Sequence, residues 1–231
     1  MKDFIVSIRM FLFWTIVLGL VYPLLFTGAA QILFPKQANG GVVMRGGQVI
    51  GAKLIGQKFA GARYFWSRPS AVDYNPLPSG GSNSGPTSET LKASMFERSA
   101  QLKSANPDAG EPPQDLLFAS GSGLDPHISI DAAEFQSLRI AKNRSMTVSE
   151  VRNLISEATE PRQFGILGEP RVNVLALNNS LDVKQGITAA PTPAPTAVPT
   201  PLTIPAQAPP TGPPTGSAPG PPTGSATGSA K

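Results

Sequence analysis

The sequence predicts a small, irregular α+β domain on a single N-terminal transmembrane helix, followed by a disordered, proline-rich C-terminal tail. Three observations predict this organisation. Residues 10–34 contain no charged side chain, and residues 36–188 mix short strand and helix patterns. Residues 189–231 hold thirteen of the twenty-five prolines and one charge. Residues 1–9 form a short segment ahead of the helix.

The uncharged run, residues 10–34, is long enough to span a membrane. As an α-helix it extends about 37 Å, against about 30 Å for the hydrocarbon core of a bilayer. A cleaved signal peptide is the first alternative, but its apolar centre is shorter, and here Leu33 and Phe34 continue past the small residues. A buried helix of a soluble protein is the second, but such helices are rarely apolar on every face. Pro23 suggests a kink and packing against partner helices.

The positive-inside rule leaves the orientation balanced. Lys2 and Arg9 precede the run, and Lys36 and Arg45 follow it closely. Large domains after a first helix are translocated largely regardless of their charge. We therefore expect residues 1–9 in the cytoplasm and residues 36–188 outside it.

Two segments of the domain have strand patterns. Residues 48–55 read QVIGAKLI, and residues 170–177 read PRVNVLAL, in which valines alternate with an asparagine. Residues 73–86 and 106–113 are rich in proline, glycine and asparagine, which predicts loops.

Three segments have helix patterns. Thr147 and Glu150 form a capping box that opens a helix whose apolar face carries Val148, Val151, Leu154, Ile155 and Ala158. A second helix opens at residues 131–134, with Phe135 and Leu138 on its buried face. A third covers residues 88–103, with Leu91, Met95 and Leu102 facing inward.

The tail, residues 189–231, repeats PPTG three times and GSA three times. Prolines remove backbone donors, and the segment has too little apolar surface to offset the entropy of ordering. We expect a disordered, partly polyproline-II spacer. A docking strip for a proline-reading domain and an attachment to cell-wall material are the alternatives.

Composition excludes several classes of protein. The chain has no cysteine and one histidine, His127, so it has no disulfides, thiolate nucleophile or multi-histidine metal centre. Its net charge is +4, of which residues 36–188 carry +2 with sixteen basic and fourteen acidic residues. This even distribution lacks the basic patch of a nucleic-acid-binding protein.

Three stretches imitate catalytic motifs without matching them. Residues 46–53 have one residue too many for a phosphate-binding loop and continue with Leu54 instead of a hydroxyl residue. Residues 81–85 place Asn83 where a hydrolase elbow needs serine. Ser120, Ser122, Asp125 and His127 crowd one short loop, whereas a catalytic triad is assembled from distant segments. We expect no catalytic residues and no metal site in this chain.

Three series of motifs occur in order along the chain. Residues 54–83 contain LIGQ, YFWSRPSA and GGSN, residues 119–129 read ASGSGLDPHIS, and residues 167–175 read LGEPRVNVL. With the N-terminal span, these motifs resemble the C subunit of the Kdp-type potassium-transporting P-type ATPase over about residues 4–183. The resemblance implies an accessory subunit of a complex in the bacterial inner membrane. Its partners are a channel-like, potassium-binding subunit and a P-type ATPase subunit, and the complex handles ATP and potassium.

The family is described as a catalytic chaperone that raises the affinity of the pump subunit for ATP. A domain outside the cytoplasm cannot touch cytosolic ATP, so any such effect acts through packed helices, or the domain faces inward. The alternative function is a membrane-anchored extracytoplasmic binding or adhesion module. The membrane span and the proline-rich tail are the features that suggest it.

The motifs supply candidate residues for partner contacts or for structure, and each has two interpretations. Phe65, Trp66 and Tyr74 suit either an interfacial belt or partner anchor, or the core. Arg68, Asp125 and Arg171 pair within the domain or with the channel-like subunit. His127 is a helix-entry or structural hydrogen bonder, or else a ligand or pH sensor. Residues 120–123 form a tight turn or an anion nest. The full candidate set is Tyr64, Phe65, Trp66, Arg68, Pro69, Asn83, Ser122, Asp125, His127 and Arg171.

Overall fold

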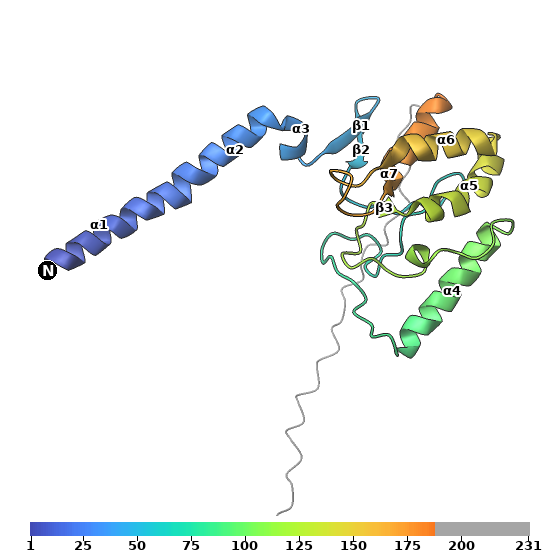
Figure 1. The fold of residues 1–231 in the computed structure, drawn as a ribbon, viewed down its shortest axis with the longest axis horizontal. Helices are drawn as coiled ribbons and strands as arrows, with labels where there is room; N and C mark the ends of the chain where they lie inside the picture. Colours follow the sequence, from blue (N-terminus) through green and yellow to red (C-terminus); the bar gives the residue numbers. More distant parts are fainter. Residues whose placement is uncertain (188–231) are drawn as a thin grey trace, which may run out of the picture. The chain divides into compact units, whose positions relative to one another are not determined.

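A computed structural model describes residues 1–187, and the predicted tail, residues 189–231, lies outside the described residues. The N-terminal part is a continuous helix made of α1 (Lys2–Ile16), a π-helical segment (Val17–Val21) and α2 (Tyr22–Leu33) (Figure 1). By length and composition, Lys2–Leu33 is apolar enough to cross a membrane. The helix therefore begins before the uncharged run and includes it almost entirely.

The π-helical segment lies directly before Pro23. A proline cannot donate a backbone hydrogen bond, and its ring clashes with the carbonyl group four residues earlier. The wider π-helical turn avoids this conflict, because the Tyr22 N–H donates to the carbonyl of Val17, five residues back. The helix continues through the proline by this change in its hydrogen-bond pattern.

A short helix, α3 (Pro35–Ala38), is followed by an antiparallel hairpin of β1 (Val42–Arg45) and β2 (Gln48–Ala52). Its two-residue turn is Gly46-Gly47, with φ of +55° and +80°, as a tight hairpin turn of the favoured twist requires. The predicted strand 48–55 is thus confirmed over residues 48–52. Sequence reasoning missed its partner β1.

The second sheet has three short strands in the order β3 (His127–Ile128), β5 (Arg171–Asn173) and β4 (Thr159–Glu160), all antiparallel. The predicted strand 170–177 is wrong beyond Asn173, where α7 (Val174–Lys184) begins. The Asn173 side chain caps this helix by accepting the Ala176 N–H. Leu177 and Leu181 are buried four residues apart, which is the period of a helix.

The remaining helices occur where the sequence patterns predict them, although some of their apolar residues are less buried than expected. The capping box of Thr147 and Glu150 opens α6 (Val148–Ala158), as predicted. The second predicted helix is α5 (Ile130–Arg144), capped by Ser129, and it buries Phe135. Leu138, however, is exposed, so its predicted burial is wrong.

The third predicted helix is α4 (Glu89–Ala105), which is followed by a single 3-10 turn (Gln114–Leu116). Of its three apolar residues expected to face inward, Leu102 is buried, whereas Leu91 and Met95 are half-buried. Residues 73–86 and 106–113 lack regular structure, as predicted.

The core lies between α5, α6, α7 and β5, which pack against one another (Figure 1). Its fully buried members include Ile128, Ile140, Val151, Ile155, Val172, Leu177 and Leu181. Ile128 of β3 and Val172 of β5 pack into this core. The polar residues of the same two strands and their flanking loops form the site described next.

Candidate functional site

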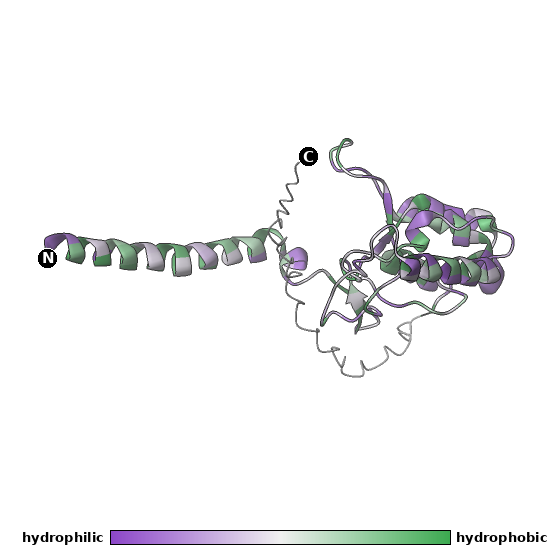
Figure 2. Ribbon diagram, turned by 90° about the horizontal axis from the view of Figure 1, so that it is seen from below, coloured by the Kyte–Doolittle hydropathy of each residue, from purple (hydrophilic) through white to green (hydrophobic). Residues whose placement is uncertain are grey.

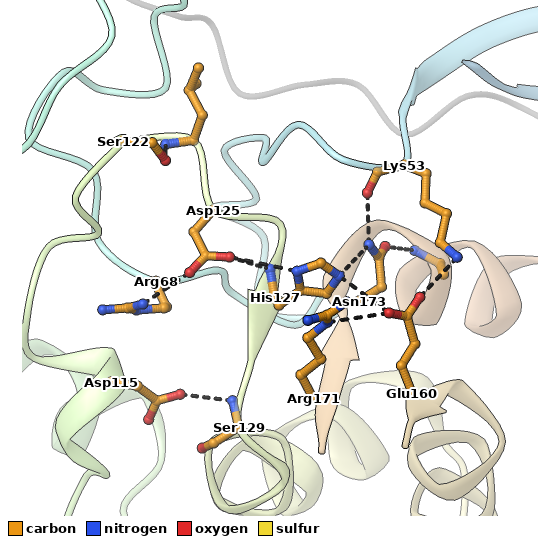
Figure 3. Close-up of polar contacts among 12 residues, drawn as sticks. Lys53, Arg68, Asp115, Ser122, Asp125, His127, Ser129, Glu160, Arg171 and Asn173 are labelled. Atoms are coloured by element: carbon orange, nitrogen blue, oxygen red, sulfur yellow. Dashed lines mark hydrogen bonds and ion pairs between the residues drawn. The ribbon is translucent and has the colours of Figure 1, made fainter. Parts of the chain in front are cut away.

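Segments far apart in the sequence meet in a groove beside β3 and β5 (Figure 3). We call it the charged groove, because most of its lining side chains are ionisable. The lining residues are Arg68, Asp115, Asp125, His127, Ile128, Ser129, Glu169, Pro170 and Arg171. Four of them belong to the candidate set predicted from sequence: Arg68, Asp125, His127 and Arg171.

The loop that carries Asp125 is held by a tight turn over residues 120–123. The Gly123 N–H donates to the Ser120 carbonyl (3.2 Å), and the Ser122 hydroxyl accepts the Leu124 N–H (3.1 Å). Gly123 has φ of +70°, and a Cβ there would lie 2.6 Å from a methyl group of Val72. Only glycine fits this backbone conformation and this close approach. Two of the four N–H groups of residues 120–123, those of Ser120 and Gly123, are already hydrogen-bonded, as in a tight turn.

Asp125 links two of the motifs. One oxygen accepts a charge-assisted hydrogen bond from Arg68 (2.9 Å), and the other accepts the backbone N–H of His127 (3.0 Å). The Arg68 and Asp125 side chains are 29% and 27% exposed. The Tyr74 hydroxyl holds the Arg68 segment by donating to the Arg68 carbonyl (2.6 Å). Burial raises the pKa of Tyr74 to about 12, so it stays a neutral donor at physiological pH.

The imidazole of His127 lies between two carboxylates. Its Nδ1 is 3.7 Å from Asp125 and its Nε2 is 3.8 Å from Glu160, and Asn173 approaches Nε2 at 3.4 Å. Burial lowers the pKa of His127, and the nearby Arg171 lowers it further, against the opposing effect of the two carboxylates. The ring is therefore neutral at physiological pH and serves as a hydrogen-bonding group.

Glu160 joins the groove to the first hairpin. It accepts from Lys53 (2.8 Å) and from Arg171 (3.3 Å), its directly opposite neighbour on β5. The hydrogen bond from Lys53 is the main cause that lowers the pKa of Glu160. Asn173 adds a second link by donating to the Lys53 carbonyl (2.8 Å). The predicted ion pair of Arg171 thus lies within the domain.

The groove is lined by ionisable side chains of both signs. His127 contacts two carboxylates and an amide, and no serine lies within hydrogen-bond reach of its ring among the described residues. Residues 1–187 also contain no group of three or more His, Asp or Glu side chains placed to hold a metal ion. Half-exposed charges of both signs suit contact with a polar surface of another molecule.

The six other candidate residues lie outside the groove lining. Phe65 is fully buried, and its backbone N–H and carbonyl bond to the Asn178 side chain (2.8 and 3.0 Å). Trp66 is half-buried, with the guanidinium of Arg139 4.3 Å from its ring. Both residues therefore belong to the interior of the domain, in keeping with the core interpretation.

The remaining candidates have local roles. The carbonyl of Pro69 accepts the Ser120 N–H (3.0 Å), which joins two motifs. Asn83 and Ser122 are exposed, and Asn83 has φ of +52°, a conformation that asparagine tolerates better than most residues. The Tyr64 hydroxyl donates to Asp182 (3.2 Å).

Asp182 is the centre of a buried cluster that sequence reasoning missed. It binds Arg45 of β1 (2.8 Å) and Arg144 of α5 (2.7 Å), and all three side chains are buried. We call Arg45, Tyr64, Arg144 and Asp182 the Asp182 network. Two features of the sequence point to it: Tyr64 belongs to the candidate set, and Asp182 follows Leu181 on the buried face of α7.

Comparison with known proteins agrees with the motifs. The family model described as "K+-transporting ATPase, c chain" (KdpC) matches residues 4–183. The chain is 50% identical to the potassium-transporting ATPase KdpC subunit of Methylococcus capsulatus over 180 residues, which cover 76% of this chain and 95% of that protein. The KdpC subunit of Geobacter metallireducens is 51% identical over 186 residues (79% and 98%). That of Acidobacterium capsulatum is 54% identical over 167 residues (71% and 89%). The chain therefore belongs to the KdpC family, the c chains of the K+-transporting ATPases.

Proposed function

We propose that this chain is a non-catalytic accessory subunit of an ATP-driven, high-affinity potassium uptake complex of the bacterial inner membrane. The family match over residues 4–183 carries the proposal, because it includes the apolar helix, the groove and the core together. The proposed partners are the channel-like, potassium-binding subunit and the P-type ATPase subunit. The chain contributes to assembly rather than to chemistry.

The helix Lys2–Leu33 is proposed as a single membrane anchor. Its apolar side chains are exposed over the whole length, which is costly in water and favourable in lipid or against other membrane helices. The π-helical segment before Pro23 gives the helix an irregular surface. Such segments occur at functional sites, which supports packing against a partner helix.

Residues 36–188 are proposed to lie outside the cytoplasm, with residues 1–9 inside. Support comes from the size of the domain after the helix, because large domains are translocated largely regardless of their charge, whereas the flanking positive charges are balanced. In this orientation the charged groove faces the compartment from which potassium is taken up. Any effect of the domain on the affinity of the pump subunit for ATP is then allosteric and is transmitted through the packed membrane helices.

Co-purification tests the proposal. The full chain carrying an affinity tag is extracted from membranes in mild detergent and analysed on a native gel, beside growth of a deletion strain in potassium-limited medium. We expect the chain in a complex with both proposed partners, and growth that depends on it. A chain that purifies alone and is dispensable in this medium points instead to an anchored binding or adhesion module.

The orientation has a separate test. Sealed inside-out and right-side-out vesicles are treated with protease, and the fate of the domain is followed on immunoblots. The domain is expected to be digested only in right-side-out vesicles, because their outer surface is the extracytoplasmic face of the membrane. Protection of residues 36–188 in right-side-out vesicles contradicts the proposed topology.

A further inference from the structure

Residues 161–169 connect β4 to β5 and form a projecting arm. Every residue of the arm is exposed. Figure 2 shows the loop standing away from the helical part of the domain, with hydrophilic residues along its stem and hydrophobic residues at its tip. The contacts of the charged groove use residues at the base of this arm but none at its tip.

The arm has a defined conformation. Gln163 and Leu167 exchange two backbone hydrogen bonds of 2.9 Å, and the stem is closed by an ion pair between Arg162 and Glu169 (2.6 Å). Phe164, at the tip, has φ of +54°. This left-handed conformation is uncommon for a bulky residue. The two backbone hydrogen bonds and the ion pair constrain the geometry of the tip.

The tip is apolar. The exposed fractions of Phe164, Ile166 and Leu167 are 91%, 77% and 58%. A single exposed apolar side chain is common, but three of them on one rigid projection indicate a contact with another molecule. Their area is small against the roughly 800 Å² that each partner buries in a stable protein interface. Such a tip can anchor a partner that other contacts already hold nearby.

We infer that the arm is a docking element that inserts Phe164 into an apolar pocket on the extracytoplasmic face of a membrane partner subunit. This inference rests on the proposed function, in which the helix Lys2–Leu33 keeps the chain beside that partner. A fixed tip loses little conformational entropy on binding, which favours a protein pocket. The charge on the arm favours it too, since Glu169 neutralises Arg162 and leaves no positive surplus to attract anionic lipid headgroups.

Site-specific photo-crosslinking in the intact complex tests the inference. Benzoylphenylalanine replaces Phe164 in the full chain, and in a matched control it replaces Leu77, an apolar residue of another loop that is 81% exposed. We expect a covalent adduct with one membrane subunit from position 164 and none from position 77. Adducts from both positions, from neither, or with lipid alone overturn the inference. A wild-type chain that purifies without partners instead refutes the proposed function.

Substitution gives a second, independent readout. The purified full chain is titrated onto a complex prepared without it. Phe164→Ala is expected to weaken association about 30-fold or more, the factor typical of an interface hot spot. Phe164→Leu should retain most of the affinity, and Leu77→Ala all of it. The melting temperature of the free chain should not change, because Phe164 is exposed. Equal affinities of Phe164→Ala and Leu77→Ala contradict the inference.

Discussion

The charged groove and the Asp182 network are both built from arginines and carboxylates, yet they differ in their access to water. In the groove, Arg68 and Asp125 remain about a quarter exposed, and the contacts around His127 are 3.4–3.8 Å long. In the network, Arg144 and Asp182 are completely buried, with ion-pair distances of 2.7 and 2.8 Å to Asp182. The comparison shows that the same residue types are fully desolvated where they join buried elements and stay partly hydrated at the groove.

The two clusters also differ in what they join. The Asp182 network connects β1, α5 and α7, and therefore holds the first hairpin on the helical core. The groove joins loops and strand ends around Asp125 and Glu160. We thus expect mutations in the network to affect folding, and mutations in the groove to affect the work of the assembled complex.

Asp182→Asn should have the largest effect on stability. The substitution removes the negative charge that pairs with Arg45 and Arg144 and leaves both arginines beside a buried neutral amide. Breaking a buried ion pair in this way lowers the free energy of unfolding by about 3–5 kcal/mol. The loss of stability is measured by unfolding the full chain with denaturant in detergent and monitoring the transition by circular dichroism. Glu89→Gln, which removes an exposed pair with Lys92, is the matched control and should leave the midpoint unchanged. A loss no larger than that of the control would show that the network is not structural.

Arg68→Met and Asp125→Asn should have a smaller effect on stability, about 1 kcal/mol or less, since their pair is partly exposed. If the groove contacts a partner, the complex still assembles but takes up less potassium. Native gels and uptake assays on the same membranes separate assembly from transport. Normal transport by both variants would assign the pair to local structure alone.

Protonation of His127 should change the stability of the domain least. Burial lowers its pKa in the folded domain below the ordinary 6.5, so below about pH 6.5 the unfolded chain binds the proton more readily. Stability should therefore decrease as the pH falls from 6.5 toward the folded pKa. His127→Gln should flatten this dependence, and Glu160 titrates in a lower range. Unfolding midpoints at pH 7.5, 6.5 and 5.5 test this, and identical slopes for both proteins contradict it.

Local signals in the sequence predicted much of the fold. The capping box at Thr147 fixes the start of α6, and the uncharged run marks the apolar helix. The motifs also indicated four groove residues, because Arg68, Asp125, His127 and Arg171 lie in motif segments that the fold brings together.

The errors have physical causes. The valine-rich run after Pro170 resembles a strand, but Asn173 caps a helix there, and capping decides where the strand ends. Polar residues of α5, including Gln136 and Arg139, are buried in place of Leu138, which apolar periodicity cannot reveal. Arg45 and Asp182 are 137 positions apart, so their pairing depends on tertiary structure alone.

The most direct test of the central claim is potassium transport by a purified complex reconstituted in vesicles with and without this chain, at low potassium. We predict that ATP-driven uptake requires the chain and that the purified chain alone hydrolyses no ATP. Equal uptake without the chain, or ATP hydrolysis by the chain on its own, contradicts the account.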